Sequence, residues 1–196
     1  MKYLPNLKLI FVLLGTCVPA TAYPHTGNTL SGFESGLLHP VLGLDHFLAM
    51  ISVGIVSAQF GGRALWLIPA TFVTVMLLGG ITGILGIYIM AVETAIAISV
   101  IVLGIAITAQ RYLSWHPVFI AVAFFAIFHG HAHGLEIPVL AKPVLYVAGF
   151  VSGTAAIHLA GVLFGVIANK YDPTKIALPI TGLLFTGAGI YMLASN

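Results

Sequence analysis

Residues 64–88 read ALWLIPATFVTVMLLGGITGILGIY, a run without a single acidic, basic or histidine side chain. About 20 apolar residues in a helix cross the hydrocarbon core of a bilayer, so this run predicts a transmembrane helix. The whole chain has the same character, because 60% of its 196 residues are hydrophobic and only 6% are charged. Soluble domains carry about 25% charged residues. So few charges cannot cover a surface that faces water, and a soluble protein is excluded.

Five further apolar stretches complete the predicted fold. The six spans lie at about 37–59, 64–88, 91–110, 116–136, 143–168 and 176–194. The fold class is therefore an all-α membrane protein, with residues 37–196 as one six-helix transmembrane domain whose links are short. The chain has no P-loop pattern and no room for a nucleotide-binding domain, so it contains no ATPase of its own. The net charge of +2 comes from basic residues in the links and gives no sign of a nucleic-acid partner. The apolar composition predicts membrane lipid as the surrounding partner, and we expect no nucleic acid as a partner.

The first 22 residues predict a cleavable signal peptide. Lys2 and Lys8 form a positively charged segment before an apolar run over 9–18, which is too short to span a bilayer. Residues 20–22 then read Ala-Thr-Ala, the pattern that signal peptidase prefers. Cleavage leaves a periplasmic N-terminal segment over 23–36. The alternative is an uncleaved anchor helix. Because Cys17 is the only cysteine, the mature chain can form no disulfide and no thiolate metal site.

The basic residues of the links set the predicted orientation. With the mature N-terminus outside, Arg63, Arg111, Lys170 and Lys175 face the cytoplasm and only Lys142 faces outward. An excess of Lys and Arg in cytoplasmic loops is the normal pattern of membrane proteins. We therefore expect a multi-pass protein of the bacterial cytoplasmic (inner) membrane with a periplasmic N-terminus.

Two patterns concern the packing of the spans. Glycines recur four residues apart at 79 and 83, at 149 and 153, and at 161 and 165, a spacing that lets helix backbones approach closely in lipid. His-Pro-Val triplets over 39–41 and 116–118 begin the first span of each half of the chain. Three spans per half would give the two halves opposite topology, so the sequence allows a 3+3 inverted repeat.

Ionisable side chains within the first span are functional candidates, because each is costly in lipid unless it is paired or hydrated. Residues 39–46 read HPVLGLDH. Pro40 suits the first turn of a helix. In one continuous helix, His39 and His46 lie two turns apart on the same face, with Asp45 beside His46.

The fourth span carries a second group, FHGHAHGLE over 128–136. His129, His133 and Glu136 line one stripe of a helix, whereas His131 points to nearly the opposite side. Spans 1 and 4 run in opposite directions, and this places both groups in the outer halves of their spans. Matching depth predicts that the two groups converge on one site.

Imidazoles with carboxylates and no thiolate suit a divalent cation such as Ni²⁺, Co²⁺ or Zn²⁺. The predicted metal ligands are His39, Asp45, His46, His129, His133 and Glu136. Three further histidines are candidates for accessory ligands: His25 near the predicted mature N-terminus, His131, and His158 in the fifth span. His158 equally suits a buried core histidine, and His116 suits the membrane interface.

The segments HPVLGLDHFLAM (39–50) and FHGHAHGLE (128–136) resemble the signature motifs of the HupE/UreJ family, as do the signal, the six spans and the length. The resemblance implies a nickel or cobalt permease linked to hydrogenase, urease or cobalamin metal supply. It also implies a functional role for the His and Asp of the first motif and the His and Glu of the second. These fall on the six predicted ligands.

The expected function is a secondary permease, not an enzyme, that takes up Ni²⁺ or Co²⁺ and holds no permanently bound cofactor. The alternative is a membrane cytochrome that binds haem between intramembrane histidines. Asp45 and Glu136 argue against haem, which prefers a dry apolar cleft. An intramembrane metalloprotease is disfavoured because the chain lacks a His-Glu-x-x-His pattern.

Signal cleavage gives a first testable prediction. The purified protein is expected to begin near Tyr23, because small residues at 20 and 22 suit signal peptidase. Mass spectrometry of the intact protein measures this directly. A mass that includes Met1 would refute cleavage and favour the anchor helix.

Overall fold

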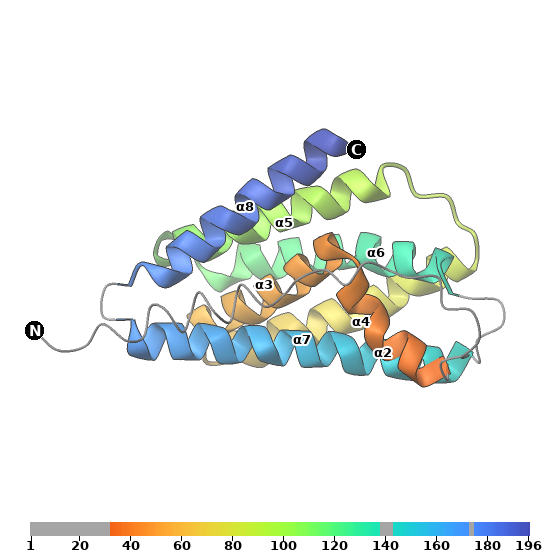
Figure 1. The fold of residues 1–196 in the computed structure, drawn as a ribbon, viewed down its shortest axis with the longest axis horizontal. Coiled ribbons are helices and arrows are strands. Elements are labelled where there is room, and N and C mark those ends of the chain that lie inside the picture. Colours follow the sequence, from red (N-terminus) through yellow and green to blue (C-terminus); the bar gives the residue numbers. More distant parts are fainter. Residues whose placement is uncertain (1–31, 138–142, 173–174) are drawn as a thin grey trace, which may run out of the picture.

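The computed structural model describes residues 32–137, 143–172 and 175–196, so the predicted signal peptide, His25 and Lys142 lie outside the described residues. The described part is all-helical (Figure 1). Its elements are α2 (Gly32–Leu42), α3 (Leu44–Phe60), α4 (Ala64–Ile84), α5 (Val92–Ala109), the 3₁₀ turn η1 (Gln110–Tyr112), α6 (Trp115–Leu135), α7 (Pro143–Tyr171) and α8 (Ala177–Ser195).

Helices α4 to α8 are each long and apolar enough to cross a membrane. The bent pair α2 and α3 makes a sixth span when the two helices are counted as one. The predicted all-α membrane fold is thus confirmed, and spans two to six lie close to their expected ranges. Large apolar side chains such as Trp66, Leu78 and Ile120 are exposed on the outer faces of the bundle, as a surface in contact with lipid requires.

The first span differs from the expected continuous helix over 37–59. The chain forms two helices that meet at Gly43 with a bend of 85°. Helix α2 begins earlier than expected and places Pro40 in its last turn instead of its first. Gly43 has extended backbone angles (φ −94°, ψ 115°) and precedes the first residue of α3. His39 and His46 therefore lie on different helices, and the shared helical face predicted for them does not exist.

Glycines bring the helices together in pairs, as their spacing predicts. An added Cβ at Gly79 or Gly83 would strike the backbone of α6, and one at Gly149 or Gly161 would strike the backbone of α2 or α3. Each of these glycines faces a carbonyl of the neighbouring helix. Such close backbone contact is the usual basis of helix association in lipid.

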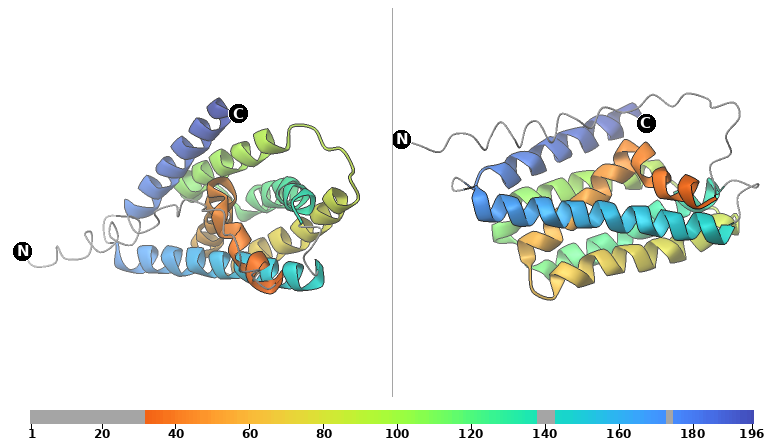
Figure 2. Two further views of the ribbon diagram at one scale, coloured as in Figure 1. Left: turned by 45° about the vertical axis from the view of Figure 1, so that its right-hand side comes forward. Right: turned by 60° about the horizontal axis from the view of Figure 1, so that its bottom comes forward.

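The pairing pattern is regular (Figure 2). Helix α4 packs along α6 in the same direction, α2 and α3 pack along α7 in the same direction, and α5 packs against α8 in the opposite direction. In a 3+3 repeat, the α2–α3 span, α4 and α5 would correspond to α6, α7 and α8. The α4–α6 pair then corresponds to the α7–α3 pair, and the α5–α8 pair corresponds to itself. The contact between α3 and α5 has no counterpart between α6 and α8 among the described residues, and the inverted repeat stays a prediction.

The glycine packing yields a prediction on stability. Gly79→Ala should lower the free energy of unfolding by about 1–3 kcal/mol, because the new methyl group meets the carbonyl of Ile127 in a close-packed interface. Gly187→Ala is the matched control in α8, since a Cβ there meets open space. Thermal unfolding of both variants in detergent measures the difference. Equal melting temperatures would contradict this account of the α4–α6 interface.

Candidate metal centre

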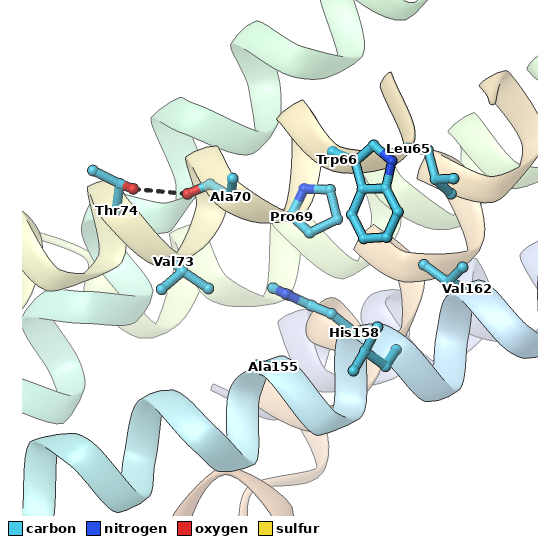
Figure 3. A pocket seen from close by; sticks show the side chains of 10 residues that line it. Leu65, Trp66, Pro69, Ala70, Val73, Thr74, Ala155, His158 and Val162 are labelled. Atoms are coloured by element: carbon cyan, nitrogen blue, oxygen red, sulfur yellow. Dashed lines mark hydrogen bonds between the residues drawn. The ribbon is translucent and has the colours of Figure 1, made fainter. Parts of the chain in front are cut away.

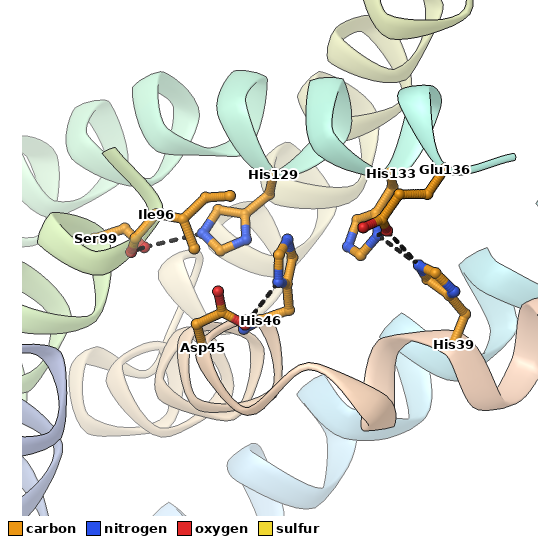
Figure 4. Close-up of polar contacts among 8 residues, drawn as sticks. All are labelled: His39, Asp45, His46, Ile96, Ser99, His129, His133 and Glu136. Carbon is orange, nitrogen blue, oxygen red and sulfur yellow. Dashed lines mark hydrogen bonds and ion pairs between the residues drawn. The ribbon is translucent and has the colours of Figure 1, made fainter. Parts of the chain in front are cut away.

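All six predicted ligands meet at one end of the bundle, where the break between α2 and α3 faces the last turns of α6 (Figure 4). Helix α2 carries His39, and Asp45 and His46 occupy the first turn of α3. Two of the others, His129 and His133, lie on α6, and Glu136 follows its end. The two sequence groups therefore converge, although the first belongs to a broken helix.

The outer cluster consists of His39, His133 and Glu136. His39 Nε2 lies 3.0 Å from both His133 Nδ1 and Glu136 Oε2, and the latter two atoms are 3.7 Å apart. Ligand atoms held about 2.1 Å from one metal ion, at right angles to one another, are separated by about 3.0 Å. The outer cluster thus has the spacing of a cation site. It is accessible from outside the bundle, since the Glu136 side chain is 58% exposed, and it is closed on its inner side by His133, which is 7% exposed.

The inner cluster consists of His46, His129 and, again, His133. The His46 ring centroid lies 4.3 Å from that of His133 and 4.9 Å from that of His129. His129 is fully buried, one turn of α6 further into the bundle than His133. The histidines of the two groups thus form a continuous row from the outer cluster inward.

Asp45 holds the inner cluster in place. Its Oδ1 accepts one hydrogen bond from the backbone N–H of His46 (2.8 Å) and another from the His46 ring at Nδ1 (2.9 Å). The first N–H groups of a helix have no partner within that helix, and the helix dipole favours a negative charge there. The break at Gly43 therefore creates a place for the Asp45 carboxylate inside the bundle.

Ser99 of α5 is a site residue that the sequence reasoning missed. Its hydroxyl oxygen lies 2.9 Å from His129 Nε2 and 2.6 Å from the carbonyl oxygen of Ile96. A lone serine in a transmembrane helix usually bonds only to a carbonyl one turn back in its own helix, so the sequence gives no sign of this contact.

Two of the three accessory candidates, His131 and His158, lie away from the outer cluster. His131 faces α4, as predicted for the opposite side of α6, and its Nδ1 lies 2.9 Å from the Thr82 hydroxyl. His158 is buried between α4 and α7 and lines a cavity of about 400 Å³ with Trp66 and Pro69 (Figure 3). Neither histidine contacts the outer cluster.

Phe72 separates His158 from the inner cluster. Its ring centroid is 5.5 Å from that of His129 and 5.2 Å from that of His158. Both nitrogens of His158 lack a hydrogen-bond partner, and the cavity beside it is lined mainly by apolar side chains. The interface position predicted for His116 is consistent with its place at the start of α6, where it stacks on Trp115.

Glu136 supplies charge to the outer cluster. The His133 ring, 3.7 Å from the carboxylate, together with the neighbouring His39, lowers the pKa of the Glu136 carboxyl to about 2. Glu136 is therefore ionised at neutral pH and offers an anionic oxygen beside two imidazoles. Such a combination of oxygen and imidazole ligands suits a divalent first-row transition metal.

Comparison with known proteins agrees with the sequence motifs. Residues 11–192 match the family described as HupE / UreJ protein. Over 162 residues, the chain is 41% identical to Protein HupE of Rhizobium leguminosarum bv. viciae, and the match covers 83% of each chain. No solved structure matches the chain.

The imidazoles of the centre predict a pH dependence. Affinity of the purified protein for Co²⁺ should fall as the pH is lowered from about 7.5 to about 5.5, because protons compete with the metal ion for the lone pairs of the imidazoles. Glu136 remains ionised throughout this range. Metal titrations at several pH values measure the effect. An affinity that does not change with pH would show that the histidines are not ligands.

Proposed function

The chain belongs to the HupE/UreJ family, and from this premise we propose that it is a secondary permease for a divalent transition metal, Ni²⁺ or Co²⁺. The family is one of membrane accessory or transport proteins and not of enzymes. The observation that carries the proposal is the outer cluster, in which His39, His133 and Glu136 each offer a ligand atom within 4.8 Å of the others. These residues come from two distant segments of a chain that has very few ionisable groups.

The charges of the centre support a divalent cation. Asp45 and Glu136 contribute two negative charges when ionised, and neutral histidines contribute none. A bound divalent ion therefore leaves the centre formally neutral, which reduces the cost of placing it inside a membrane protein. A role in binding the cation would also explain the presence of Asp45, because an ionisable group within a membrane span is costly without a partner.

The position of the centre supports uptake. In the proposed orientation, the exposed outer cluster faces the periplasm and receives the ion from solution. Transporters commonly place their binding sites at discontinuous helices, as the α2–α3 break does here. The opposite end of the bundle has a cavity of about 720 Å³, lined in part by Gln59, Arg111 and Asp172, which would face the cytoplasm. A membrane potential negative inside favours inward movement by about 2.3 kcal/mol per charge per 100 mV.

The metal would supply an enzyme system that uses nickel or cobalt, such as hydrogenase, urease or cobalamin synthesis. The competing function, a haem-binding cytochrome, is disfavoured by the spacing of the histidines. The ring centroids of His46 and His133 are 4.3 Å apart, which leaves no room for a porphyrin between the two imidazoles.

Metal uptake by cells tests the proposal. His46→Ala and Asp45→Ala should each lower Ni²⁺ or Co²⁺ uptake to the level of cells that lack the protein, because each change disrupts the hydrogen-bonded pair in the first turn of α3. The apolar packing of the bundle should keep both variants in the membrane. Uptake is measured with radioactive metal, normalised to the abundance of the protein in membranes.

His116→Ala is the control, since His116 lies at the start of α6 and far along that helix from the centre. It should leave uptake unchanged. Normal uptake by both α3 variants at wild-type abundance would overturn the assignment of a transport role to the centre.

A further inference from the structure

Three buried imidazole nitrogens of the inner cluster have no hydrogen-bond partner: His46 Nε2, His129 Nδ1 and His133 Nε2. The His46 ring on α3 lies between the two rings of α6, with its centroid 4.9 Å from that of His129 and 4.3 Å from that of His133 (Figure 4). An unpaired buried polar atom destabilises a folded protein and is rare in native structures. Three such atoms along one row of rings indicate a place for a ligand that accepts lone pairs from nitrogen.

The partner of His46 fixes which of its nitrogens carries the proton. The Asp45 carboxylate can only accept a hydrogen bond, so His46 Nδ1 must be the protonated nitrogen in their 2.9 Å contact. Neutral His46 then carries its lone pair on Nε2, the nitrogen without a partner. A carboxylate bonded to the second nitrogen of a metal-binding histidine is a common arrangement in metalloproteins.

Ser99 fixes the proton of His129 by the same logic. The Ser99 hydroxyl donates its hydrogen to the carbonyl oxygen of Ile96 at 2.6 Å. Its oxygen must therefore accept the hydrogen bond from His129 Nε2–H at 2.9 Å. The lone pair of His129 then lies on Nδ1, which again is the nitrogen without a partner.

We propose that these three rings turn toward an ion that leaves the outer cluster and bind it through His46 Nε2, His129 Nδ1 and His133 Nε2. This would be a second, inner position for the transported cation, with Ser99 as a positioning residue that acts through His129. The inference rests on the proposed function and adds to it the route by which the ion leaves the outer cluster. Three imidazoles select borderline cations such as Ni²⁺, Co²⁺ and Zn²⁺ over Mg²⁺ and Ca²⁺, which prefer oxygen ligands.

His133 belongs to both positions and allows only one to be complete at a time. A neutral imidazole has one lone pair, so His133 binds the outer ion through Nδ1 or the inner ion through Nε2. When the ion moves inward, the Nε2 proton is lost to water and Nδ1 takes up a proton from water, so the ring stays neutral. Glu136, 3.7 Å from Nδ1, lies beside that new proton. One chain therefore holds one ion.

The inner position can be tested alone in the purified full-length His39→Ala protein, which lacks a ligand of the outer cluster. This variant should still bind one Co²⁺, with a visible absorption spectrum typical of nitrogen ligands. Adding Ser99→Ala should weaken Co²⁺ affinity about 10- to 100-fold, the usual effect of removing a group that orients a metal-binding histidine.

Ser57→Ala, added to His39→Ala in the same way, is the matched control. Ser57 is also fully buried, and its hydroxyl donates to the carbonyl of Gly54 one turn back, but no hydrogen bond joins it to a histidine within the described part of the chain. This change should leave the affinity and the spectrum unchanged. His129→Ala provides a second variant, which removes the ligand itself, in case Ser99→Ala does not fold.

Three results would overturn the inference: a His39→Ala protein that binds no Co²⁺, an affinity unaffected by both Ser99→Ala and His129→Ala, or two Co²⁺ ions bound to one wild-type chain. Uptake measurements distinguish a failure of the proposed inner position from a failure of the proposed transport function. If these variants contradict the inner position while Asp45→Ala still abolishes uptake, the proposed transport function stands. If wild-type cells show no uptake, the transport function itself fails.

Discussion

The hydrogen bonds of Asp45 at the break between α2 and α3 are the interaction on which the centre depends. A helix that begins within a membrane protein exposes N–H groups that no water or lipid can satisfy. One oxygen of Asp45 accepts the backbone N–H of His46 and the proton on its ring. The same carboxylate thereby stabilises the start of α3, orients an imidazole and brings negative charge to the site. Gly43 makes room for this, since a Cβ there would lie only 3.1 Å from the Asp45 oxygen.

Close helix packing keeps the two histidine groups facing each other. Glycines hold α6 against α4 and hold α7 against both halves of the broken span, so the helices have little freedom to shift. The role of each α6 histidine then depends on which neighbouring helix its side chain faces. His129 and His133 face the break and join the clusters, whereas His131 faces Thr82 of α4.

The two clusters differ in ways that suit successive steps of binding. The outer cluster has an exposed carboxylate that can meet a hydrated ion, and the inner cluster offers buried imidazoles. An ion that passes from one to the other exchanges oxygen ligands for nitrogen and loses its remaining water. Beyond the inner cluster stands the ring of Phe72, and then the apolar surroundings of His158, which offer no charged partner among the described residues. The row of polar ligands thus ends at His129, against the ring of Phe72.

The sequence by itself determined the membrane fold, spans two to six, the glycine positions of close helix contact and the six ionisable residues that gather at one end. These follow from local composition and from spacing along single helices. Pro40 and Gly43 are present in the sequence, but whether such residues start, bend or break a helix depends on the side chains that pack around them. The 85° break was therefore decided only by the tertiary structure. The contact of Ser99 with His129 joins α5 to α6, and no pattern within either helix encodes it. The free nitrogen of each imidazole likewise depends on a partner from the surrounding fold, because hydrogen bonding to one ring nitrogen decides where the other lone pair lies.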